Sequence, residues 1–130
     1  MDLLLDTHVV LWAGAEPEKL TAPVREALEH RTARVFVSAL TAAELACAQE
    51  RGKMKLKLHW KIWFRKLLGE CGWECLPLNL ETFEEAFSLP ETFHGDPADR
   101  LLVATARLHR LRLITADARI RSYPHVGCLW

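Results

Sequence analysis

The sequence predicts one α/β domain over residues 1–130, a three-layer α/β/α sandwich around a mostly parallel sheet of four to five strands. Short apolar or β-branched runs alternate with segments of helical periodicity along the whole chain. Strands joined through helices favour right-handed crossovers and hence parallel pairing. A chain of 130 residues, 50% of them hydrophobic, is long enough to bury one such core.

Five short segments predict strands because they are apolar or β-branched and are closed by polar or turn residues. Leu3–Leu5 is an apolar run that ends at Asp6 and Thr7, which is typical of a buried strand. Arg34–Ser38 is β-branched and aromatic and predicts the second strand. The other strands are expected at Cys75–Leu78, Arg112–Thr115 and Val126–Trp130.

Between these strands, apolar side chains recur every three or four residues, which is the spacing of a helix with one buried face. The clearest case runs from Trp60 to Leu68 and leaves its basic side chains on the opposite face. Pro97 opens another helix that continues through to Arg110, since proline suits the first turn. Further helices are expected from Thr7 to near Gly14, from about Thr21 to Leu28, from about Thr41 to Gln49 and from Glu81 to Ser88.

Charge is balanced over the whole chain but segregated along it. The 17 lysines and arginines equal the 17 acids, so the total gives no electrostatic signature of nucleic acid or an acidic membrane. Residues 51–66, however, hold seven bases and no acid, and residues 67–99 hold eight acids and no base. No apolar run reaches the roughly 18 residues of a membrane helix, and Asp2 and Asp6 are atypical of a signal peptide. We therefore expect a cytoplasmic protein without membrane contact.

Four carboxylates occupy positions that the predicted topology brings to one edge of the sheet. They are Asp6 after the first strand, Glu44 in the helix after the second, Asp99 at the start of the helix before the fourth, and Asp117 after the fourth. Open α/β sheets bind ligands beyond the carboxyl ends of their strands. Taken singly, each acid also fits a helix-capping interpretation. These caps are Asp6 before Thr7, a Thr41–Glu44 capping box, and Asp96 before Pro97 with Asp99 in the first turn, while Asp117 could cap a turn at Ala118 and Arg119.

As a set, the four carboxylates indicate a cation. Two carboxylates 4 Å apart repel each other by about 4 kcal/mol at an effective dielectric constant of 20. Hard oxygen ligands suit Mg²⁺ or Mn²⁺, as one or two ions. Such a site predicts hydrolysis of phosphodiester bonds by a metal-activated water, without a protein nucleophile.

Four segments in order resemble the signature segments of the PIN-domain nucleases across nearly the whole chain. These segments are Leu4–His8, Ser38–Glu44, Asp99–Ala106 and Leu113–Asp117. The chain most resembles the VapC toxins of bacterial and archaeal type II toxin–antitoxin pairs. It resembles the branch with a His-x-Asp-Pro-x-Asp-Arg segment, which here is His94–Arg100.

The resemblance implies a PIN-like sandwich and a Mg²⁺- or Mn²⁺-dependent endoribonuclease that an antitoxin protein neutralises, and we expect a homodimer. Asp6, Glu44, Asp99 and Asp117 match the family's acidic quartet, and we expect Asp6 and Asp99 to be direct metal ligands. Supporting roles are open for Thr7, Thr115 and Asp96, and Asp96 is either a fifth acid of the site or a helix cap. His8 stands where many relatives have asparagine, and its role is either packing or a contact behind the ligands.

The basic block offers possible RNA contacts. Lys53, Lys55 and Lys57 could contact RNA phosphates, as could Arg100, and a solvated helix face is the alternative for the block. The aromatic residues from Trp60 to Phe64 predict core packing, with an exposed stripe for the antitoxin or a second protomer as the alternative. The alternative for the whole chain is a catalytically silent RNA-binding or regulatory module with the same fold.

Overall fold

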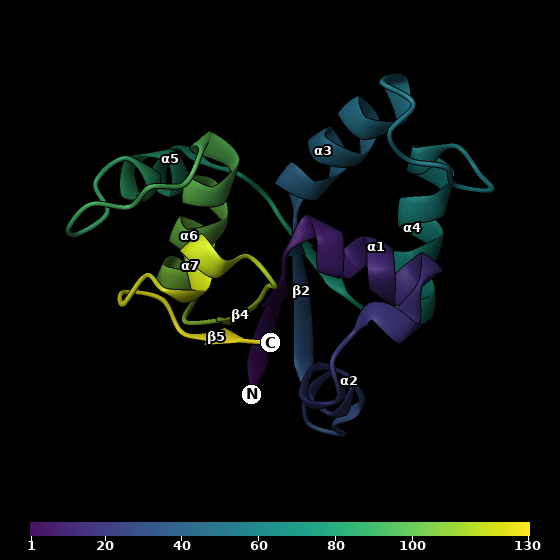
Figure 1. Ribbon diagram of the computed structural model, residues 1–130, viewed down its shortest axis with the longest axis horizontal. Helices are drawn as coiled ribbons and strands as arrows, with labels where there is room; N and C mark the ends of the chain where they lie inside the picture. The colour runs from purple at the N-terminus through teal and green to yellow at the C-terminus, as the bar shows by residue number, and fades with distance from the viewer.

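Five strands form the central sheet in the order β3-β2-β1-β4-β5, and every pairing is parallel. The computed structural model describes all 130 residues (Figure 1). The strands are β1 (Asp2–Leu5), β2 (Arg34–Ser38), β3 (Glu74–Leu76), β4 (Arg112–Ile114) and β5 (Cys128–Leu129). The predicted α/β class is confirmed, with a sheet that is wholly parallel.

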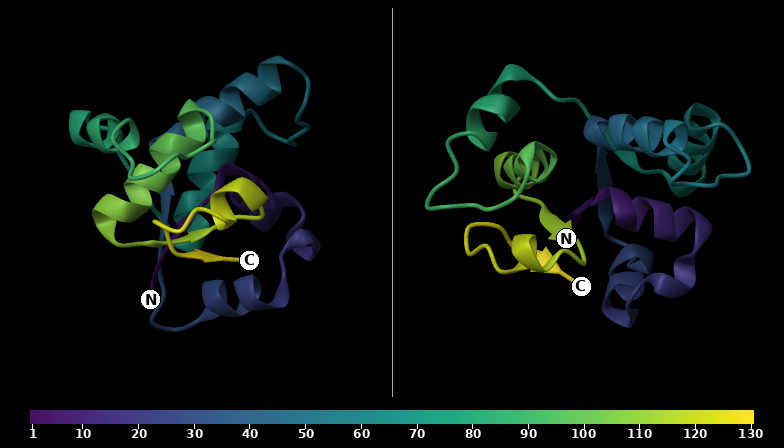
Figure 2. Two further views of the ribbon diagram at one scale, coloured as in Figure 1. Left: turned by 60° about the vertical axis from the view of Figure 1, so that its left-hand side comes forward. Right: turned by 45° about the horizontal axis from the view of Figure 1, so that its top comes forward.

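Helices cover both faces of the sheet, which gives the expected three layers. Figures 1 and 2 show α1 to α4 on one side and α5 to α7 on the other. The helices are α1 (Thr7–Ala15), α2 (Ala22–Glu29), α3 (Ala39–Glu50), α4 (Trp60–Cys71), α5 (Leu80–Ala86), α6 (Pro97–His109) and α7 (Ala118–Arg121), with a 3-10 turn at Pro17–Lys19. None of these helices combines the length and apolar character that crossing a bilayer requires.

Two hydrophobic cores fill the spaces between the layers. Because side chains alternate along a strand, Leu3 and Leu5 point into one core and Leu4 points into the other. Phe64 of α4 is 5% exposed in the first core, and Trp60 and Trp63 pack against the same cluster. The core interpretation of this aromatic stripe is therefore confirmed.

Three elements differ from the sequence-based expectations. Strand β3 ends at Leu76, before Pro77, because proline has no N–H to donate to a ladder. Helix α3 begins at Ala39 with the Ser38 hydroxyl as its N-cap, so the predicted Thr41–Glu44 capping box is wrong. The segment after Asp117, expected to be a turn, is the short helix α7.

The topology decides where a site forms. Strand β1 lies at the centre of the sheet, and the chain proceeds outward from it through β2 to β3 on one side and through β4 to β5 on the other. Leu5, the last residue of β1, pairs with Val37 of β2 and with Ile114 of β4. The residues that follow these strands therefore meet at one switch point, where open α/β sheets bind ligands.

Candidate metal centre

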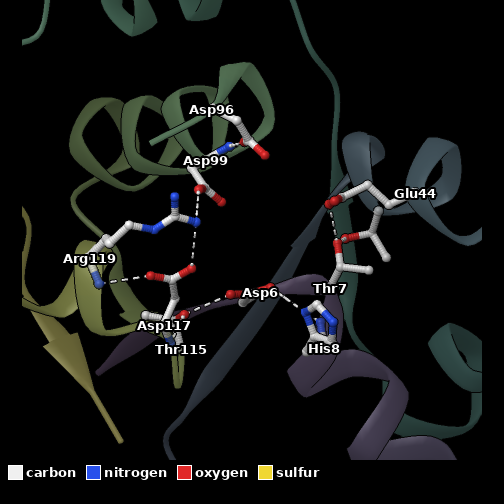
Figure 3. Close-up of polar contacts among 10 residues, drawn as sticks. Asp6, Thr7, His8, Glu44, Asp96, Asp99, Thr115, Asp117 and Arg119 are labelled. Atoms are coloured by element: carbon white, nitrogen blue, oxygen red, sulfur yellow. Dashed lines mark hydrogen bonds and ion pairs between the residues drawn. The ribbon is translucent and has the colours of Figure 1, made fainter. Parts of the chain in front are cut away.

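Asp6 occupies the middle of this edge, directly after β1 (Figure 3). Its Oδ1 accepts a hydrogen bond from the His8 backbone N–H at 3.2 Å and caps α1. Its Oδ2 accepts a hydrogen bond from the Thr115 hydroxyl at 2.6 Å. Thr115 is fully buried, and its hydroxyl oxygen accepts the Asp117 backbone N–H at 3.1 Å. The carboxylate of Asp6 is thus oriented from the first turn of α1 and from the residue that follows β4.

Asp99 projects from the first turn of α6 toward the same edge. Its side chain is 19% exposed, and its Oδ2 is buried without a hydrogen-bond donor. The pKa of Asp99 is raised to about 6, first by burial and then by the charges of Asp96, Asp117 and Asp6, against the opposing charge of Arg119. A buried carboxylate oxygen without a donor is unfavourable in a protein interior. This oxygen has the surroundings of a cation ligand.

Asp96 is the N-cap of α6, since its Oδ1 accepts the Asp99 backbone N–H at 2.8 Å. Gly95, just before it, packs closely on the site, because an added Cβ would lie 2.7 Å from the Asp99 Cβ. Arg100 fixes the same segment by donating to the Phe93 carbonyl at 3.0 Å. The guanidinium of Arg100 is therefore engaged within the protein, and the RNA contact expected of Arg100 stays a prediction.

Asp117 is the N-cap of α7 and contacts Arg119 in two ways. Its Oδ1 accepts the backbone N–H groups of Arg119 at 2.8 Å and Ile120 at 3.3 Å. Burial would raise the pKa of Asp117, but these hydrogen bonds and the Arg119 guanidinium lower it below its ordinary value. Nη2 of Arg119 lies 3.5 Å from Asp117 Oδ2 and 3.5 Å from Asp99 Oδ2.

Glu44 reaches the edge from α3, on the other side of Asp6 from Asp99 (Figure 3). Its Oε1 accepts a hydrogen bond from the Thr7 hydroxyl at 2.6 Å, and the Thr7 hydroxyl lies 3.1 Å from that of Thr41. The side chain as a whole is exposed, but burial of its carboxyl end raises its pKa. The Thr7 hydrogen bond opposes this shift, and the charge of Asp6 adds to it.

The structure brings Asp6, Asp99 and Asp117 to one side of the edge and leaves Glu44 on the other. No three histidine, cysteine or acidic side chains stand close enough together to form a preassembled metal site. Like-charge repulsion accounts for this spacing. The residues present fit a hard divalent cation, because the donors are carboxylate oxygens and one of them is buried without a partner.

Comparisons with known proteins show the family of this chain. The PIN domain family model matches residues 3–126. The chain belongs to the PIN domain family. Ribonuclease VapC22 of Mycobacterium tuberculosis is 37% identical to this PIN domain over 123 residues, which cover 95% of this chain and 92% of that protein. At this identity and coverage, the resemblance to the VapC proteins is confirmed.

Two solved structures share the fold of this PIN domain. VapBC2 from Rickettsia felis, bound to a promoter DNA fragment, has a TM-score of 0.72 at 16% identity, over 99% of this chain and 98% of that chain. A toxin–antitoxin complex from Klebsiella pneumoniae has a TM-score of 0.65 at 21% identity, over 95% of this chain and 94% of that chain. These similarities confirm the predicted sandwich.

Basic and aromatic side chains flank the carboxylates in this PIN domain. His8 is exposed, with its Nδ1 3.9 Å from Asp6 Oδ1 and its ring 5.9 Å from that of Trp12. A groove of about 890 Å³ runs along α1 from His8. Lys53, Lys55 and Lys57 line this groove from the loop before α4, together with apolar side chains.

Arg119 is the residue beside the candidate site that sequence reasoning missed. Its place two residues after Asp117 is the only feature of the local sequence that indicates a position near the site. Its position beside Asp99, 20 residues away in the chain, follows from the tertiary structure. The Thr7–Glu44 contact, over 37 residues, also follows from the tertiary structure, although both residues were expected at the site.

Proposed function

We propose that this PIN domain is a divalent-cation-dependent endoribonuclease and the toxin of a VapBC-type toxin–antitoxin pair. The observation that carries the proposal is the approach of Asp6, Asp99 and Asp117 around the buried, donor-free Oδ2 of Asp99. The 37% identity to a protein named ribonuclease VapC22 supports RNA as the substrate.

Each carboxylate has a distinct role in this proposal. Asp6 and Asp99 would hold one or two Mg²⁺ or Mn²⁺ ions, with Asp117 and Glu44 as further oxygen ligands. A bound cation would supply an activated water and neutralise charge on the scissile phosphate. Thr115 keeps Oδ2 of Asp6 directed at the site.

The residues around the ligands hold them in place. Thr7 fixes the carboxyl group of Glu44 through its hydroxyl hydrogen bond. We assign Asp96 to the helix cap, since its Oδ1 is occupied by the Asp99 backbone N–H. His8 stands at the exposed rim of the site, beside Asp6.

The lysine-lined groove is the proposed path of the RNA backbone. Lys53, Lys55 and Lys57 are exposed and lie along a groove that begins at His8, next to Asp6. Neutralising backbone phosphates with lysines releases counterions, so RNA affinity falls as salt rises. Neutral total charge is compatible with this substrate because the basic residues are concentrated locally.

An antitoxin and a second copy of the chain are the proposed protein partners. The structural neighbours include complexes described as VapBC and toxin–antitoxin, which supports an antitoxin for this PIN domain. Helix α5 and the residue after it expose Leu80 (75%), Phe83 (43%) and Phe87 (59%), a cluster typical of protein contacts. We assign this cluster to the homodimer, and we place the protein in the cytoplasm with its RNA substrate.

The proposal predicts RNA cleavage that depends on added cation. Purified protein incubated with structured RNA should generate fragments in Mg²⁺ or Mn²⁺, with 5′-phosphate and 3′-hydroxyl ends. Excess chelator should abolish cleavage, because the carboxylates cannot polarise water on their own. Mapping the fragment ends on a sequencing gel measures both outcomes. Undiminished cleavage in excess chelator would contradict the mechanism.

The second candidate function is an RNA-binding module without turnover. The lack of a preassembled metal site is the observation that favours it. That module would retain RNA on a filter and yield no fragments in any divalent cation, so the same assay separates the two candidates.

A further inference from the structure

Arg119 stands between two of the acids that we propose as cation ligands. Its Nη2 is 3.5 Å from Asp99 Oδ2 and 3.5 Å from Asp117 Oδ2, and it is the basic group that bridges this pair (Figure 3). Toward Asp117 the contact is a long hydrogen bond, and toward Asp99 it is an ion pair without hydrogen-bond geometry. One positive charge therefore partly neutralises the two carboxylates.

The guanidinium is free to leave this position, whereas the backbone of Arg119 is fixed. The backbone N–H is held by Asp117 Oδ1 at 2.8 Å, in the first turn of α7. The side chain is 60% exposed and contacts the acids only at its tip. Exposed ion pairs of this length are weak, so another cation can displace the guanidinium without unfolding the helix.

We propose that Arg119 is an internal counter-ion that competes with the divalent cation for Asp99 and Asp117. This inference rests on the proposed cation site. Bound cation and guanidinium repel each other at such short range, and both neutralise the same carboxylate oxygens. The protein with Arg119 therefore needs a higher cation concentration than its acids alone would require.

Arg121 provides a matched control on the same helix. It is an exposed arginine two residues further along α7 that forms no ion pair with an acid, and its charge acts on the Cys128 thiol. Removing either arginine changes the net charge equally, so a difference between the two variants reports the local competition at Asp99 and Asp117.

The test is Mn²⁺ binding to the full chain, measured from the free Mn²⁺ signal in electron paramagnetic resonance. R119Q should bind Mn²⁺ more tightly than wild type, by about 3- to 10-fold in Kd, the range expected for losing one or two exposed ion pairs. R121Q should change the Kd by less than about twofold, because Arg121 forms no ion pair with Asp99 or Asp117 and salt screens a more distant exposed charge. Circular dichroism of each variant checks that α7 and the fold are retained.

A D99N variant makes the two possible failures distinguishable. If D99N binds Mn²⁺ as tightly as wild type, the proposed cation site itself is wrong. If D99N binds poorly while R119Q matches wild type, binds more weakly, or changes no more than R121Q, the site stands and the competition by Arg119 is overturned. Tighter binding confined to R119Q supports the competition.

Discussion

Replacing Asp6 or Asp99 with asparagine should lower the rate of RNA cleavage by at least about a hundredfold, because each change removes a charged cation ligand. Asparagine is isosteric, so in D6N its Oδ1 can still accept the His8 backbone N–H and cap α1, while its Nδ2 would donate to the Thr115 hydroxyl oxygen in place of accepting from it. The measurement is the initial rate on one labelled RNA at saturating Mn²⁺, with circular dichroism to confirm folding.

Asp2 supplies the control for these variants. Asp2 is the first residue of β1, at the opposite end of the strand from Asp6, and its carboxylate lies 3.9 Å from the guanidinium of Arg34. D2N removes one negative charge outside the site and should cleave RNA at close to the wild-type rate. Full activity of D6N and D99N, or an equal loss in D2N, would contradict the assigned ligand roles.

The same D99N change should stabilise the cation-free protein at neutral pH, by about 1–2 kcal/mol after allowance for solvent screening. The pKa of Asp99 rises on folding from an ordinary 3.8 to about 6, mainly through burial and then through the charges of Asp96 and Asp117. Above that pH the folded protein carries a charge that its surroundings disfavour. An asparagine amide carries no such charge.

The sign of the pH dependence follows from proton binding. Between about pH 4 and pH 6 the folded protein binds more protons at Asp99 than the unfolded chain does, so wild-type stability falls as pH rises through this window. D99N has no carboxyl group at this position to titrate, so its stability does not fall in this way. Urea denaturation in chelator should therefore give similar unfolding free energies for wild type and D99N at pH 4. At pH 7.5 it should give a higher value for D99N.

Adding Mn²⁺ should reverse this order at pH 7.5, because a cation that binds only the folded state stabilises it, and D99N has lost a ligand. A D99N variant that is no more stable than wild type in chelator at pH 7.5 would contradict the electrostatic account of Asp99. A difference in unfolding free energy between D99N and wild type that does not change with pH would also contradict it.

Most of the fold followed from local sequence patterns, because strand and helix periodicities were clear and the crossovers have one hand. The structure also resolves the two interpretations of the acids. Asp6, Asp96 and Asp117 each accept backbone N–H groups as N-caps, and the charges of all three also raise the pKa of Asp99. Capping and a place in the candidate site are compatible at the end of a parallel strand.

Side-chain directions were harder to predict than positions. Arg100 adjoins Asp99 in sequence, but consecutive residues on a helix point about 100° apart, so it turns to the Phe93 carbonyl. The Thr41–Glu44 capping box failed because Ser38 already caps α3, which places Thr41 inside the helix and beside Thr7. The position of the Arg119 side chain depends on the orientation of the four-residue helix α7, which the local sequence does not determine.

The most direct test of the proposed centre is a crystal structure of the protein soaked in Mn²⁺, with an anomalous difference map. We expect a peak within about 2.5 Å of carboxylate oxygens of Asp6 and Asp99, with Asp117 or Glu44 nearby, and Arg119 turned away from Asp99. Mn²⁺-dependent RNA cleavage by protein whose anomalous density lies away from both Asp6 and Asp99 would contradict the account.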